Sequence, residues 1–236
     1  MLGSRTAMPR RARADAEAPF WISFADLMTA LMVLFLVVMG VALLAVTKTV
    51  TERERIQQQH RDDVARVVQR FADAARRYDG IRVDAQRNVI DFGDRARFAF
   101  GSSTLAPEQQ QLLRQFVPEM LALANDELGR RVLKRMVVEG YTDTTGTYLA
   151  NLNLSLQRSQ RVLCAMFATA GANPLSDAQK QDVRRLFLVG GYSYNDAKGS
   201  DEQSRRVEMR LEFLEPGARR DVAAADGADF GECALK

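Results

Sequence analysis

An uncharged apolar run near the N-terminus is the strongest pattern along the chain. Residues 27–46 are twenty positions without a charged side chain. At about 1.5 Å rise per residue they span roughly 30 Å, the thickness of one bilayer core. Phe20 and Trp21 precede the run, as aromatic anchors at a membrane interface do. A signal peptide, the competing interpretation, has a shorter apolar core and a small-residue cleavage site. The pattern therefore predicts one retained transmembrane helix over residues 20–46.

A helical pattern follows the apolar run and changes character midway. Residues 52–63 are almost wholly polar, which predicts a solvated spacer, although a plug or a dimerising stalk is an open alternative. Apolar residues then recur every three or four positions and predict a helix that packs on a domain. These residues are Val64, Val67, Val68, Phe71, Ala74, Ala75 and Tyr78. We expect a linker helix over residues 47–79.

Short strand patterns alternate with helical ones in the rest of the chain. Strands are predicted at 81–84, 89–92, 136–140, 186–191 and 207–213, and helices at 108–125, 147–170 and 177–185. The buried face of the helix over 147–170 is predicted to carry Leu149, Leu152, Leu156, Leu163 and Phe167. This alternation predicts the α/β class, with helices covering a sheet in a sandwich over residues 80–214. Residues 215–236 are small and polar and are expected to form a tail.

The composition narrows the function classes. With the membrane segment set aside, 236 residues leave room for one domain of ordinary size. The net charge of +3 comes from interspersed Arg, Asp and Glu, so no basic patch predicts nucleic-acid binding. The single histidine, His60, and two cysteines exclude a Cys/His zinc site and a histidine-based triad. We therefore expect no enzyme activity, no metal site and no cofactor.

The orientation in the membrane rests on weaker signals. Four basic residues lie within residues 1–19, and four lie within the fifteen residues after the span. The positive-inside rule therefore favours neither orientation. A short tail before a large domain favours a cytoplasmic N-terminus over residues 1–19. In a translocated domain, the pair Cys164 and Cys233 suggests a disulfide. A buried free Cys164 with an unpaired Cys233 is the alternative.

Asp26 is an acidic residue immediately before the apolar run, and two interpretations are open. In one, Ser23 caps a helix and Asp26 lies in its first turn as part of a capping box. In the other, Asp26 lies roughly 8 Å deeper than the aromatic anchors, at about 1.5 Å per residue. There it would be desolvated, its protonated form would be accessible, and it would carry ions.

The residues around Asp26 resemble a known family. The stretch Phe20-Trp21-Ile22-Ser23-Phe24-Ala25-Asp26-Leu27-Met28-Thr29-Ala30 is similar to the signature of MotB-type stator subunits. The resemblance implies that Asp26 is the residue that carries protons. Thr29 and Ala30, one turn further, would line the same face of the helix.

A second resemblance covers roughly residues 80–213. Thr142-Asp143, Gly146, Asn151, Leu154-Ser155 and Arg158 match the pattern of OmpA-like peptidoglycan-binding domains at every fixed position. The resemblance implies that Asp143 and Arg158 hold the ammonium and carboxylate of wall diaminopimelate, with Thr142 and Asn151 in the site. Arg205 and Arg206 are weaker candidates, because Ser204 stands where the family pattern has Asn. A structural Asp143–Arg158 ion pair is the alternative.

Further stretches are similar to one branch of this family, the MotB-like ZorB subunits of Zorya anti-phage systems. They lie at residues 19–23, 31–39, 154–159, 186–191, 195–198 and 204–208. The resemblance implies two copies inside a ring of five MotA-like ZorA subunits in a bacterial inner membrane, with the domain in the periplasm. Protons, rather than sodium, are the expected coupling ion. A flagellar stator subunit and a static membrane-to-wall tether are the alternatives.

Overall fold

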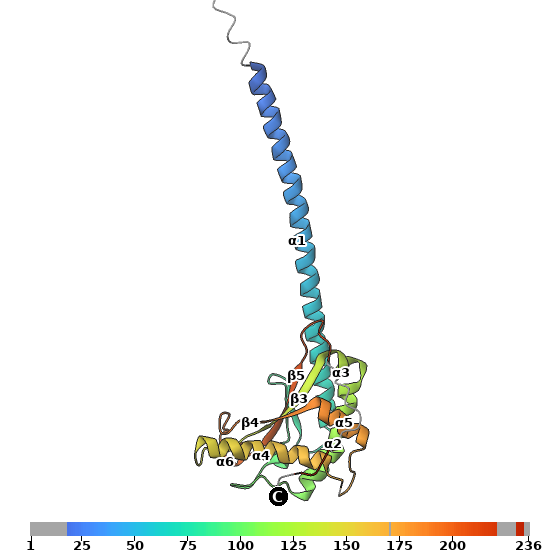
Figure 1. Ribbon diagram of the computed structural model, residues 1–236, viewed down its shortest axis with the longest axis vertical. Helices are drawn as coiled ribbons and strands as arrows, with labels where there is room; N and C mark the ends of the chain where they lie inside the picture. Colours follow the sequence, from blue (N-terminus) through green and yellow to red (C-terminus); the bar gives the residue numbers. More distant parts are fainter. Residues whose placement is uncertain (1–17, 170, 221–229, 234–236) are drawn as a thin grey trace, which may run out of the picture. The chain divides into compact units, whose positions relative to one another are not determined.

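The computed structural model describes residues 18–169, 171–220 and 230–233. The chain forms two compact units, Met1–Ile56 and Gln57–Lys236, and helix α1 (Ala18–Ala75) contributes to both (Figure 1). Most of the expected tail over residues 1–19 lies outside the described residues, as does much of the tail over residues 215–236.

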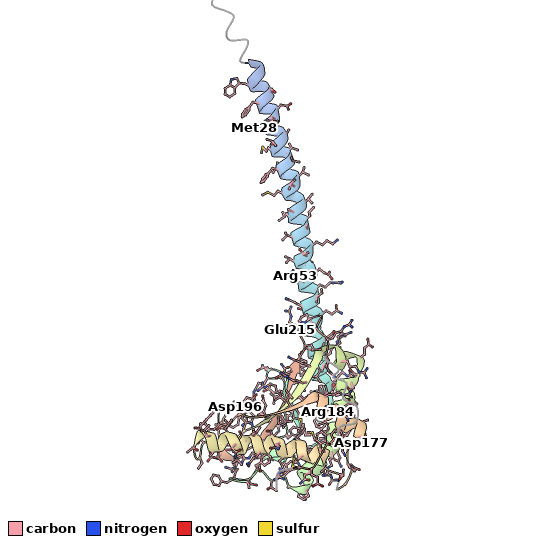
Figure 2. All side chains as sticks on the ribbon, in the orientation of Figure 1. Met28, Arg53, Asp177, Arg184, Asp196 and Glu215 are labelled. Carbon is pink, nitrogen blue, oxygen red and sulfur yellow. A yellow bond between two sulfur atoms is a disulfide. The ribbon has the colours of Figure 1, made fainter. Side chains whose placement is uncertain are left out.

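The N-terminal part of α1 exposes its apolar side chains all round. Side chains project from every side of this segment (Figure 2), and the best 18-residue window has a mean hydropathy of 2.8 with none of it buried. Among the described residues, α1 alone is long and apolar enough to cross a membrane. A helix that is apolar all round needs an apolar environment, which agrees with a transmembrane segment.

The capping interpretation of Asp26 is wrong. Helix α1 begins at Ala18, five residues before Ser23. Ser23 is therefore inside the helix and cannot be its N-cap, and Asp26 lies beyond the first two turns. An acidic side chain at that depth gains little from the helix dipole, which acts within the first turn.

The C-terminal part of α1 packs into the second unit as its spacing predicts. Val67, Val68, Phe71, Ala74 and Ala75 are buried, and Val64 and Tyr78 are partly buried against the same core. One predicted solvated residue is not solvated. Asp63 is 3% exposed and pairs with Arg66 and, at 2.8 Å, with Arg131. A buried carboxylate needs such partners because an unpaired one is costly to desolvate.

The second unit is a two-layer α/β sandwich, so the predicted fold class is confirmed. Its five-stranded sheet has the order β1-β2-β5-β3-β4, with β3 and β4 parallel and the other pairs antiparallel. The strands are β1 (Arg82–Asp84), β2 (Val89–Asp91), β3 (Leu133–Gly140), β4 (Phe187–Gly191) and β5 (Val207–Phe213). The helices are η1 (Gly93–Ala96), α2 (Pro107–Asn125), α3 (Glu127–Val132), α4 (Tyr148–Phe167), α5 (Asp177–Leu186) and α6 (Asp201–Ser204).

Three short elements, the start of β3 and the end of α4 differ most from the sequence predictions; α4 ends at Phe167, three residues before the predicted end. Helices η1, α3 and α6 have four to six residues, too few for an apolar period to be seen. Strand β3 begins at Leu133, three residues earlier than predicted, because its first residues pair with the end of β5. The two consecutive basic residues Lys134 and Arg135 hide the start of the strand in the sequence pattern.

The two faces of the sheet are built differently. One face carries the apolar residues of β2, β3, β4 and β5, and the helices pack on it. The opposite face carries Glu139 and Glu208, which lie directly across from each other and are both fully buried. Arg210 holds both oxygens of Glu139, at 2.7 and 2.9 Å, and Arg206 and Arg87 hold Glu208, at 2.7 and 3.0 Å. These guanidinium groups cover this second face of the sheet.

The predicted buried face of α4 is wrong in part. Leu149 and Leu156 are 73% and 42% exposed. The first half of α4 buries the polar residues Asn151 and Ser155 instead, and the second half buries Arg158, Ser159, Val162, Ala165 and Met166. The apolar period misled the prediction because the first half of α4 packs against loops and strand ends rather than against the apolar core.

The C-terminal segment is fastened to the domain at two points. Cys164 on α4 and Cys233 form a disulfide, which confirms the predicted pair. Arg220 donates to the carbonyl oxygens of Ala124 at 3.0 Å, Gly129 at 3.0 Å and Leu133 at 2.6 Å. A cation suits the carbonyl of Ala124 in particular, because it lies in the last turn of α2, where carbonyls lack partners within the helix.

We predict that the disulfide contributes substantially to stability. It closes a loop of 69 residues, and the chain-entropy account assigns such a loop up to about 4 kcal/mol. The double variant Cys164→Ser, Cys233→Ser should therefore unfold at a lower denaturant concentration than the wild type. A reducing agent should lower the unfolding midpoint of the wild type to that of the variant and leave the midpoint of the variant unchanged. Two titratable thiols in the unreduced wild type would contradict the bridge.

Candidate functional site

The loop that follows β3 holds Asp143 in an ion pair. Asp143 is 4% exposed. Its Oδ2 accepts from Nη1 of Arg205 at 3.0 Å, and its Oδ1 accepts from the backbone N–H of Thr145, also at 3.0 Å. The partner of Asp143 is thus Arg205, and the alternative of a direct Asp143–Arg158 ion pair is wrong. The run Ser204-Arg205-Arg206-Val207 was the only sequence signal for this arrangement.

Two glycines let α4 lie against the ends of β3 and β4. A Cβ on Gly140 would be 1.9 Å from the carbonyl oxygen of Ser155, and one on Gly191 would be 2.7 Å from the backbone nitrogen of Leu156. Such contacts are far below van der Waals distance, so only glycine permits this approach. The close approach brings the next turn of α4, with Arg158, to the strand ends.

Arg158 is fully buried and joins three segments. Its Nε donates to the carbonyl of Ser102 at 2.9 Å, its Nη1 to Tyr141 at 2.7 Å and its Nη2 to Ala99 at 3.3 Å. The guanidinium also lies 5.1 Å from the ring centre of Phe98. Burial lowers the pKa of Arg158 to about 10, although the nearby Asp143 opposes this shift. These bonds use three of the five N–H groups of the guanidinium.

Thr142 presents a buried hydroxyl beside Asp143. The residue is 1% exposed, and its backbone N–H donates to the carbonyl of Ser193 at 2.9 Å. Its Oγ1 has no hydrogen-bond partner among the described residues. A buried polar atom without a partner is costly, and such atoms are rare in folded proteins. This hydroxyl is therefore ready to bond a polar group that enters the loop.

Asn151 shapes the loop rather than facing outward. It is 5% exposed, and its Nδ2 donates to the carbonyl of Thr145 at 2.8 Å. Gly146 in the same loop has a φ of 98°, which favours glycine. The amide of Asn151 thus closes the turn that presents Thr142 and Asp143.

The structure separates the two weaker candidates. Arg205 joins Asp143, whereas Arg206 is 4% exposed and lies over the ring of Tyr141 at 4.2 Å. Arg206 also bonds Oδ2 of Asp196 at 2.6 Å (Asp196 is labelled in Figure 2). Arg206 therefore belongs to the charged face of the sheet, and only Arg205 belongs to the loop with Asp143.

In the first unit, Asp26, Thr29 and Ala30 share one side of α1. Residues three and four positions apart on a helix are neighbours. The Oγ1 of Thr29 donates to the carbonyl of Asp26 at 2.8 Å, which turns the hydroxyl back along the helix.

Sequence reasoning missed two contributors to the domain site. Ser193 and the 99–102 segment bond Thr142 and Arg158 largely through backbone groups. A carbonyl oxygen is present at every position, so residue type carries no signal for such contacts.

Comparison with known proteins gives matches along most of the chain. The family described as "Membrane MotB of proton-channel complex MotA/MotB" matches residues 7–57, and the OmpA family matches residues 97–190. The Zorya protein ZorB of Escherichia coli O139:H28 (strain E24377A / ETEC) is 42% identical over 233 residues. This match covers 98% of the chain and 94% of that protein.

Solved structures match at lower identity. The cell wall anchor of the T6SS from Pseudomonas aeruginosa has a TM-score of 0.40 and 22% identity, over 62% of this chain and 96% of that one. The C-terminal domain of Helicobacter pylori MotB has a TM-score of 0.34 and 15% identity, over 50% and 81%. At this similarity neither carries an argument about residue roles.

We predict that Asp143 ionises at an unusually low pH and that Arg205 is responsible. Burial raises the pKa of Asp143, but bonds from Arg205 and Thr145 outweigh it and hold the pKa below the ordinary 3.8. A lowered pKa stabilises the fold above the unfolded value, and this contribution is lost as pH falls through the folded value. The ¹³C carboxyl shift of Asp143, followed against pH, should show a higher pKa in Arg205→Ala. An unchanged pKa would show that Arg205 does not set it.

Proposed function

Because this chain belongs to the ZorB family of MotB-like membrane subunits, we propose that it is the wall-anchored, proton-carrying stator subunit of a rotary motor in a Zorya anti-phage system. The observation that carries the wall-binding part is the cluster of Asp143, Thr142 and Arg158 at the end of β3. The carboxylate in the apolar helix α1 supports the proton-carrying part.

The chemistry of the β3 loop suits a zwitterionic amino acid group such as that of wall diaminopimelate. Its ammonium is a donor, and Asp143 and the unpartnered Oγ1 of Thr142 are acceptors. Its carboxylate is an acceptor for N–H groups of Arg158 that the three backbone carbonyls leave unused. Three N–H groups of the buried Arg158 position the surrounding segments, and its remaining two N–H groups would contact the ligand.

Arg205 is the competitor of the incoming ammonium. It already bonds Oδ2 of Asp143 at 3.0 Å. Two guanidinium groups and one carboxylate leave the loop with a surplus positive charge, which attracts a carboxylate. We propose that Arg205 keeps Asp143 ionised and shares it with the ligand.

The proton path is assigned to Asp26. In a membrane this carboxylate would be the lone acidic group within its part of α1, and its protonation by an ion from the periplasm would neutralise it. Each unit charge that crosses the potential releases about 2.3 kcal/mol per 100 mV. With two copies inside a ring of five ZorA subunits, this energy would turn the ring while the wall holds the stator.

The proposed membrane arrangement is a single span with the N-terminus in the cytoplasm and the sandwich in the periplasm. The Cys164–Cys233 disulfide supports this orientation, because disulfides persist in oxidising compartments. In this proposal the span covers residues 20–46, the linker residues 47–79 and the wall-binding domain residues 80–214.

Asp143→Asn tests wall binding with a neutral side chain of the same size. A charge-assisted hydrogen bond contributes about 1.5–3 kcal/mol, so the full chain in micelles should bind purified sacculi at least about tenfold more weakly. The matched control is Asp177→Asn on α5, whose side chain is 93% exposed (labelled in Figure 2). Co-sedimentation measures the bound fraction. Equal binding by both variants and the wild type would rule out the wall-binding site.

Asp26→Asn tests the proton-carrying role. It should abolish protection in a phage plating assay while sacculus binding stays at the wild-type level. The control is Asp62→Asn, an exposed acidic residue on α1 beyond the apolar span. Retained protection in Asp26→Asn would favour a static tether. Loss of swimming rather than of phage protection after deletion would favour a flagellar stator.

A further inference from the structure

Large side chains are exposed next to the loop that carries Asp143. Tyr148 begins α4 and is 41% exposed. A single exposed aromatic side chain is common on protein surfaces, so the fixed orientation of Tyr148 and its place beside the loop carry the argument. The proposed wall-binding chemistry uses neither Tyr148 nor its neighbour Tyr194.

Ser193 fixes these aromatic residues beside Thr142. It is fully buried with a φ of 54°, a left-handed conformation that is uncommon for serine. Its carbonyl accepts from the N–H of Thr142 at 2.9 Å, its Oγ donates to the carbonyl of Tyr148 at 3.1 Å, and its N–H donates to Oγ of Ser155 at 3.0 Å. The backbones of Thr142 and Tyr148 therefore both contact one residue, and strain of this kind is typical of binding sites.

The two tyrosine rings form an oriented pair. Their centres are 5.7 Å apart and their planes are 82° from each other. Nδ2 of Asn195 donates to the hydroxyl of Tyr148 at 3.3 Å. The Tyr148 side chain is thus held in one orientation while it stays accessible, which is what a stacking surface requires.

We infer that Tyr148 and Tyr194 form a subsite for a pyranose ring of the glycan strand that carries the bound stem peptide. The C–H bonds on one face of a pyranose ring pack on the electron-rich face of an aromatic ring. Diaminopimelate is the third residue of the stem, so the sugar lies roughly 10 Å from it at about 3.3 Å per extended residue. Tyr148 is five positions after Asp143, an extended reach of at most about 18 Å, and the shared contact of Thr142 and Tyr148 with Ser193 makes the separation shorter.

This inference rests on the proposed wall-binding function and extends it from the peptide to the sugar. It predicts that the site distinguishes peptidoglycan fragments by whether the sugar is present. Asp143 and Thr142 would bind the peptide in both cases, and only the tyrosine pair would sense the glycan.

The test compares two soluble probes, the disaccharide-tripeptide and the free tripeptide L-Ala-D-Glu-diaminopimelate. Titrated against the full chain in micelles, the wild type should bind the disaccharide-tripeptide roughly three- to tenfold more tightly. Tyr148→Ala should remove this advantage and leave tripeptide binding at the wild-type value. Tyr148→Phe should keep the advantage, and so should the control Leu149→Ala, which alters the adjacent 73% exposed side chain.

Several outcomes would overturn the inference. Equal wild-type affinity for both probes would show that no sugar subsite exists, while the peptide site would stand. An equal loss for both probes in Tyr148→Ala would assign Tyr148 to the shape of the loop. A change in oligomeric mass in Tyr148→Ala would assign the pair to a protein interface. If the wild type bound neither probe, the wall-binding proposal itself would fail.

Discussion

The buried guanidinium of Arg158 is the interaction on which the candidate site depends. Its desolvation is costly and lowers its pKa. Three backbone carbonyls, at Ser102, Tyr141 and Ala99, offset that cost. Those carbonyls belong to two segments, residues 99–102 and the residue that follows β3, and Arg158 holds both segments to α4. Under the proposed function, ligand binding and local folding would therefore be coupled at Arg158.

Most of the fold could be predicted because its elements are long enough to show a period. The apolar run, the packed end of α1, strand β5 and helices α2 and α5 follow their sequence patterns closely. The same reasoning failed on α4, where Leu149 and Leu156 are at helical spacing yet exposed. Periodicity indicates which residues of a helix can face a core. The first half of α4 instead packs on loops and on strand ends that contain glycine, and the local sequence of α4 does not show what it packs on.

The candidate site was predictable in its residues and not in its pairings. The motif from Thr142 to Arg158 contains the side chains that the structure brings to the end of β3. Arg205, the partner of Asp143, is 62 positions away in the sequence. A single sequence does not show that two residues so far apart form an ion pair. The unpartnered hydroxyl of Thr142 and the strained Ser193 are properties of packing and backbone conformation, so they become visible only in three dimensions.

The charged face of the sheet has a consequence for a protein exposed to changing ionic strength. Glu139 and Glu208 are fully buried beneath arginine side chains. Salt weakens ion pairs between solvent-exposed side chains, whereas it screens buried pairs much less. The Arg55–Glu52 pair of α1 belongs to the exposed kind. A rise in salt concentration would therefore weaken the ion pairs along the surface of α1, while the buried pairs of the sheet would change much less.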